Sequence, residues 1–200
     1  LAFGKSADAV NIKKHITGIR PYSSVDENLF MRGAATTLGW KAVETTFFYS
    51  KKKIDANVID TLPDGAALAV SSLQETGYHA IPSEISDKHA IEQQIMGGNI
   101  SYKKIKFRVG ITGVNTQLGA DVVHMGELYN RFAFSSKKLT NIGVDYNFIV
   151  KNFNFFGEAA ISDNGSPAFV NGVVASLDAH ISIAVIHRDY PKDYQSLMSN

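Results

Sequence analysis

The segment LTNIGVDYNFIVKNFNFFGEAAIS, residues 139–162, alternates apolar and polar side chains on both sides of a break at Lys151 and Asn152. A period of two residues indicates a β-strand with one apolar and one polar side. Two such strands joined by so short a break predict a β-hairpin. The apolar side chains of this hairpin, which would face lipid in a membrane barrel, are those of Ile142, Val144, Tyr146, Phe148, Phe153 and Phe155.

The same alternation recurs in three further pairs of runs. The expected strands are residues 31–40 and 43–50, 98–103 and 107–117, and 168–177 and 181–189. With the first hairpin they predict an all-β fold, an antiparallel up-and-down meander of about eight strands within residues 31–200. Residues 1–30 are expected to be an N-terminal strand or linker.

Residues 51–97 are expected to form a long loop that carries a short helix. Ser83 or Ser86 could cap this helix, Ile91 and Ile95 are spaced four apart, and two glycines follow them. These are the start, spacing and stop signals of a helix.

The lengths of the connections suggest which solvent meets each side of the sheet. Short breaks at residues 41–42, 104–106, 151–152 and 178–180 alternate with longer links at 51–97, 118–138 and 163–168. Outer-membrane barrels have this asymmetry, with tight turns at one rim and long loops at the other. A Greek-key sandwich would mix the lengths. The pattern therefore predicts part of a transmembrane β-barrel, and a soluble β-sandwich binding module remains the alternative from another class.

Aromatic residues are placed where a barrel has its interfacial girdles. Those close to the short breaks are Trp40, Phe107, Phe148, Phe153 and Phe155, and the candidates for the opposite rim are Tyr49, Tyr129 and Phe134.

Composition excludes several classes of protein. The chain has 200 residues, a net charge of +1 and no cysteine. The balanced charge does not favour nucleic-acid binding, and the lack of cysteine excludes disulfides and zinc–thiolate sites. No apolar run is long enough for a transmembrane helix. The chain is expected to be an internal fragment of a longer protein.

The polar side of the sheet would line the barrel lumen. The expected lumen-facing residues are Lys103, Arg108, Asp145, Asn147, Asn154, Glu158 and Arg188. Charges of both signs favour cross-strand pairing that fills the bore over a selective channel lining.

No catalytic, cofactor or metal site is expected, and the protein is not predicted to be an enzyme. His79 and His89 are ten residues apart and fit no metal-ligand template. HRDY, residues 187–190, lacks the other motifs of a kinase, and no Gly-x-Ser-x-Gly elbow occurs.

Four blocks of sequence resemble the C-terminal barrel region of large Bacteroidota outer-membrane proteins of the helix-hairpin-helix-domain, or ComEA-like, family. The blocks are GIRPYSSVDENLFMRGAA at 18–35, FFYSKKKIDAN at 47–57, SSLQETGYHAIPSEISDKHAIEQQIMGGNISY at 71–102 and ASLDAHISIAVIHRDYPKDYQSLMSN at 175–200. The resemblance implies an outer-membrane barrel larger than eight strands could close. No helix-hairpin-helix element occurs in these residues, so nucleic-acid binding is not carried over.

The expected function is that of a structural or accessory subunit of an envelope secretion, assembly or export complex in the outer membrane. Its expected partners are outer-membrane lipid or lipopolysaccharide and other subunits of such a complex. The alternative within the barrel class is a pore for solutes or nucleic acid.

Overall fold

The computed structural model describes residues 19, 30–124, 131–178 and 181–197. Strands make up 66% of these residues and helix 3%, which confirms the all-β class. The expected segment at residues 1–30 lies outside the described residues except for Ile19 and Phe30.

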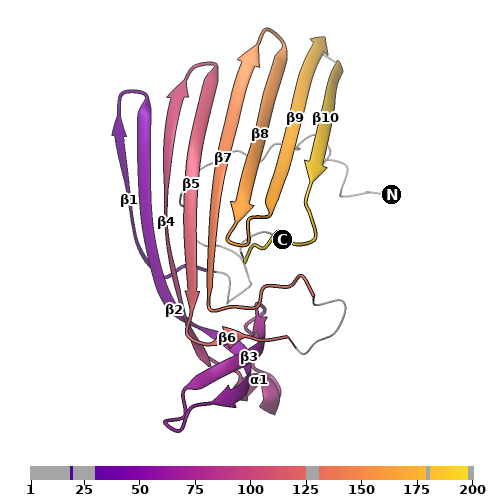
Figure 1. The fold of residues 1–200 in the computed structure, drawn as a ribbon. Coiled ribbons are helices and arrows are strands. Elements are labelled where there is room, and N and C mark those ends of the chain that lie inside the picture. Colours follow the sequence, from indigo (N-terminus) through magenta and orange to yellow (C-terminus); the bar gives the residue numbers. More distant parts are fainter. Residues whose placement is uncertain (1–18, 20–29, 125–130, 179–180, 198–200) are drawn as a thin grey trace.

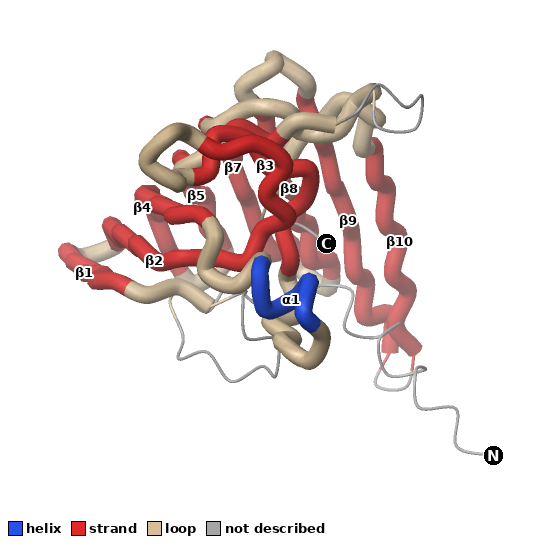
Figure 2. Tube along the Cα trace, turned by 90° about the horizontal axis from the view of Figure 1, so that it is seen from below, coloured by secondary structure: helices blue, strands red, loops and turns tan. Residues whose placement is uncertain are grey.

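Eight long strands form a curled half-barrel sheet (Figures 1 and 2). They are β1 Gly33–Trp40, β2 Val43–Thr61, β4 Ile91–Lys104, β5 Phe107–Leu118, β7 Lys138–Val150, β8 Phe153–Ser162, β9 Pro167–Asp178 and β10 Ile181–Asp189. Neighbouring long strands are antiparallel, in the order β1-β2-β4-β5-β7-β8-β9-β10. The four hairpins predicted from the alternation are all present.

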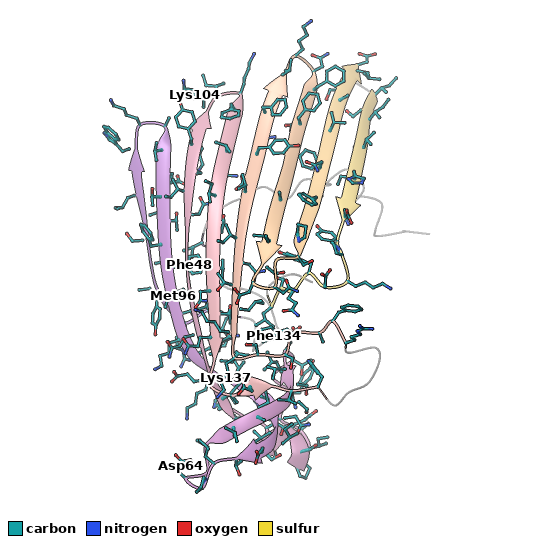
Figure 3. All side chains as sticks on the ribbon, in the orientation of Figure 1. Phe48, Asp64, Met96, Lys104, Phe134 and Lys137 are labelled. Carbon is teal, nitrogen blue, oxygen red and sulfur yellow. The ribbon has the colours of Figure 1, made fainter. Side chains whose placement is uncertain are left out.

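The short turns of the hairpins lie together at one end of the sheet (Figure 1). Lys41 and Lys151 each occupy the first position of a two-residue turn, with φ angles of 54° and 52°. Positive φ in such turns lets two strands of right-handed twist remain paired. Figure 3 labels Lys104 at this end, which we call the short-turn rim, and Asp64 at the opposite end of the molecule.

The end opposite the short-turn rim carries a small distal module, which corrects the expectation of a long loop over residues 51–97. Strand β2 continues to Thr61 and pairs with β3 Ala67–Gln74, which in turn pairs in parallel with β6 Asp121–Val122. The core of the module contains Ile54, Ala56, Val70, Ile91, Leu118, Ala120 and Val122.

The expected helix is shorter and earlier than the sequence pattern suggests. It is α1 Pro82–Ser86, with its N-cap at Ile81, so neither Ser83 nor Ser86 caps it. The Glu84 carboxylate instead accepts hydrogen bonds from the N–H groups of Ala80 and Ile81, at 2.8 and 3.2 Å.

Ile91 and Ile95 do not belong to the helix. They lie in β4, where they pair with Ile54 and Ser50 and are 4% and 2% exposed. A spacing of four residues is a multiple of the strand period, so it places two side chains on one face of a strand as readily as on one face of a helix.

Both outer strands of the half-barrel leave one edge open. Among the described residues, β1 pairs only with β2, and β10 pairs only with β9. Each edge therefore presents backbone N–H and C=O groups that another strand could bind.

Candidate functional site: the two faces of the curled sheet

One face of the sheet is apolar from edge to edge. Side chains of directly paired residues in an antiparallel sheet point to the same face, so the register assigns each residue to a face. Taking one side chain from each long strand, this apolar face carries Leu38, Phe47, Ile100, Ile111, Val144, Ile161, Phe169 and Val185, which are between 39% and 63% exposed. All six residues expected on the apolar side of the hairpin lie on this face.

Aromatic rings gather on the apolar face near the short-turn rim. The rings of Phe148 and Phe155 stack with centroids 4.9 Å apart, and those of Phe153 and Phe155 with centroids 6.2 Å apart. Trp40 and Phe107 lie on the same face beside their own turns. Girdles of aromatic residues at the rims of membrane barrels are arranged in the same way.

At the opposite end, the prediction of a second girdle is wrong for Phe134. Phe134 packs against the core of the distal module, because the chain after β6 folds back onto it. Tyr129 lies outside the described residues. Tyr49 does lie on the apolar face and is 42% exposed.

All seven residues expected on the polar side lie together on the other face. This polar face is the more buried of the two: the side chains of Arg108 and Asp145 are 18% and 14% exposed, whereas Val144 on the other face is 42% exposed. Side chains on the concave side of a curled sheet converge and shield one another. The polar face is therefore the concave one.

Charges on the polar face pair across neighbouring strands. The Arg108 guanidinium lies 2.5 Å from the Asp145 carboxylate, and the Lys103 ammonium lies 2.7 Å from Glu44. Glu158 is directly opposite Asp145 in the register, which places a second carboxylate beside the Arg108 pair. The two ion pairs neutralise charges of both signs on the polar face.

Amide side chains continue the network toward the short-turn rim. Asn147 donates a hydrogen bond to the Asn154 side chain at 2.5 Å and another to the Phe155 carbonyl at 3.0 Å.

Two phenylalanines on the polar face were missed by the sequence reasoning. The Phe156 ring lies over Gly172, so close that a methyl group added there would be 2.4 Å from it, and the Phe48 ring lies over Gly97 in the same way. One sequence feature could have predicted them. Each belongs to a Phe-Phe doublet, and two adjacent residues of a strand point to opposite faces, so one ring of each doublet must lie on the polar face.

The C-terminal strap, residues 190–197, crosses back over the polar face at the end away from the short-turn rim (Figure 1). Asn141 donates a hydrogen bond to the Gln195 carbonyl at 2.8 Å, and the Gln195 N–H donates to the Ser162 hydroxyl at 3.3 Å. Burial raises the pKa of the Tyr194 phenol, and the nearby Glu158 carboxylate adds to this rise.

The distal module contains a buried acid that the sequence analysis treated as part of a loop. Asp55 is fully buried and accepts a hydrogen bond from the His89 N–H at 2.8 Å. Its other oxygen lies 2.8 Å from the Nε2 of His79. Asp55 thus connects both histidines to the module through hydrogen bonds. No group of three or more His, Cys, Asp or Glu within the described part of the chain could hold a metal ion.

Comparisons with known proteins do not identify a family. No protein-family model, curated protein or solved structure matches the chain. Among the described residues, no helix is long and apolar enough to cross a membrane.

Proposed function

We propose that this chain is part of a β-barrel in the bacterial outer membrane, as a structural or accessory subunit of an envelope secretion, assembly or export complex. The observation that carries the proposal is the apolar face, which is exposed across all eight long strands. Water-soluble monomers rarely leave so wide an apolar surface uncovered. If the apolar face contacts lipid hydrocarbon, the free-energy cost of exposing it to water disappears.

The soluble sandwich is less well supported because the described residues contain no second sheet that covers the apolar face. A sandwich buries the apolar face of one sheet against another. All strands of the described residues belong to a single connected sheet, and its apolar face remains exposed.

The contents of the concave side support a structural role over an open pore. The Arg108–Asp145 and Lys103–Glu44 pairs neutralise charge of both signs there. The Phe156 ring and the C-terminal strap occupy further space on that side. A channel that selects ions by charge would instead present unpaired groups of one sign. The relationship to the helix-hairpin-helix-domain outer-membrane proteins belongs to this proposal and is supported by the sequence blocks alone.

The proposal is tested by locating the natural protein in cell fractions. We expect it in the outer-membrane fraction and in the detergent phase of a phase separation, with an electrophoretic mobility that changes on boiling. We also expect it to co-purify with a larger envelope assembly. Recovery in the aqueous phase without a mobility change would refute the barrel, and stable single-channel conductance by the isolated protein would refute the structural role in favour of the pore.

A further inference from the structure

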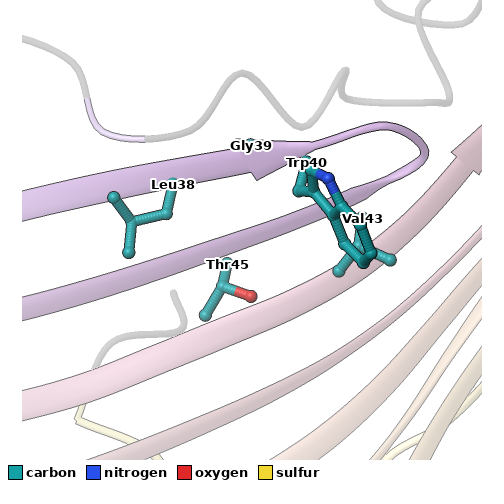
Figure 4. Close-up of a pocket in the computed structure, with 5 residues that line it drawn as sticks. All are labelled: Leu38, Gly39, Trp40, Val43 and Thr45. Atoms are coloured by element: carbon teal, nitrogen blue, oxygen red, sulfur yellow. The ribbon is translucent and has the colours of Figure 1, made fainter.

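A groove opens on the apolar face at the tip of the β1–β2 hairpin (Figure 4). Its volume is about 440 Å³ and its lining is almost wholly apolar, from Leu38, Gly39, Trp40, Val43 and Thr45. The register explains the hollow, because Leu38 pairs with Thr45 and Trp40 pairs with Val43. The small Thr45 side chain thus lies between larger neighbours and leaves space above itself.

Two lysines lie at the rim end of this groove. The Lys41 ammonium lies 4.9 Å from the centre of the Trp40 ring. The Lys104 ammonium lies 5.6 Å from the ring of Tyr102, which is the residue paired with Val43 on the adjoining strand. Cations over aromatic rings at this distance remain available to an anion on their open side.

The described residues do not neutralise the charge of this corner. Within residues 30–124, neither Lys41 nor Lys104 takes part in an ion pair. The nearest acid along the hairpin, Glu44, lies on the polar face and is already bound by Lys103. An apolar groove that ends at two ammonium groups without an ion-pair partner among the described residues is complementary to a molecule with a hydrocarbon chain and an anionic head.

We propose that the groove binds one anionic glycerophospholipid of the surrounding membrane, with an acyl chain over Thr45 and its phosphate between Lys41 and Lys104. This rests on the proposed function, since the groove reaches lipid only if the apolar face does. Each lysine near an anionic lipid surface contributes roughly a fivefold preference, so the pair should favour phosphatidylglycerol over phosphatidylcholine by about 25-fold.

Trp40 reports on its own site because it is the only tryptophan of the chain. The full chain is reconstituted in phosphatidylcholine vesicles that contain a small fraction of bromine-labelled phosphatidylglycerol or bromine-labelled phosphatidylcholine, and quenching of Trp40 fluorescence is measured. We expect the phosphatidylglycerol probe to reach the same quenching at a fraction about 25-fold lower. Replacing both lysines, Lys41→Gln with Lys104→Gln, should abolish this preference.

Two further variants separate charge from shape. Thr45→Phe fills the groove and should weaken quenching by both probes while the protein keeps its heat-modifiable mobility. Lys151→Gln removes the matching lysine of the β7–β8 turn, far along the sheet, and should leave the preference unchanged. Equal quenching of the parent by the two probes, or a preference that survives the double lysine replacement, would overturn the inference and leave the barrel standing. No quenching by either probe would instead count against the membrane barrel itself.

Discussion

Val144 and Gly143 are neighbours in β7 that lie on opposite faces of the sheet. The same substitution at each position therefore compares the surroundings of the apolar face with those of the polar face. With the apolar face in lipid, as proposed, we expect Val144→Arg to destabilise the protein in the membrane and Gly143→Arg to be tolerated. The first variant places a guanidinium on the apolar face. The second places it on the polar face, beside the Glu158 carboxylate.

The size of the effect follows from the position of Val144 within the apolar run. Tyr146 is the middle of the run from Ile142 to Val150 in β7, and Val144 is two residues away from it. Two residues span about 7 Å along a strand, or about 5 Å of membrane depth at a tilt near 45°. An Arg at the bilayer midplane costs about 2 to 4 kcal/mol, and the cost falls toward the interfaces. We therefore expect Val144→Arg to lose about 2 kcal/mol.

Gly143 has room for a side chain. A methyl group there would meet its nearest atom, the Ala159 carbonyl oxygen, at 3.5 Å, and Glu158 Oε1 at 3.7 Å. Removing a glycine from a strand recovers about 0.5 to 1 kcal/mol, while fixing a long side chain costs up to about 2 kcal/mol. The net change should be within about 1.5 kcal/mol.

The assay is reversible denaturant unfolding in lipid vesicles, with Val150→Arg as a depth control. Val150 lies on the same face as Val144 but beside the short turn, so an Arg there should cost only about 0 to 1 kcal/mol. If Gly143→Arg proved the more damaging of the adjacent pair, the assignment of the faces would be reversed. If the two apolar-face variants cost the same, the face would be packed against protein instead of lipid.

Three further predictions concern the polar face and the distal module. A double-mutant cycle on Arg108→Ala and Asp145→Ala should give a coupling of about 2 kcal/mol in unfolding experiments, and a value near zero would mean that the pair is not formed. Gly172→Ala should destabilise the protein by about 1 to 3 kcal/mol because its methyl group would overlap the Phe156 ring, and stability equal to the parent would contradict that packing. Asp55→Ala should cost about 1 to 3 kcal/mol and speed amide hydrogen exchange in the distal module alone, whereas uniform acceleration across the sheet would show that the module is not a separate unit.

The hairpins could be predicted from sequence because their information is local. Each joins two runs with a period of two across a turn of two or three residues, as at Lys151 and Asn152. The face of each side chain then follows from parity, which is why the expected polar and apolar sets separated correctly.

The distal module could not be predicted because its determinants are distant in sequence. β3 and β6 pair in parallel across about fifty residues, and β6 has only two residues. Asp55 lies two residues after three lysines and resembles part of a solvated charge run, yet it is buried and hydrogen-bonded to His79 and His89 from a later segment. The groove at Trp40 likewise depends on which residues the register places opposite one another.

The open edges of the half-barrel restrict which strands can close it into a ring. β1 runs toward the short-turn rim and β10 runs away from it, as the arrows in Figure 1 show. In a ring of alternating strand directions, the total number of strands must be even. Since the described residues contribute eight long strands, any partner or further segment that closes the ring in an antiparallel manner must supply an even number of strands. A single inserted strand would pair in parallel with one of its two neighbours.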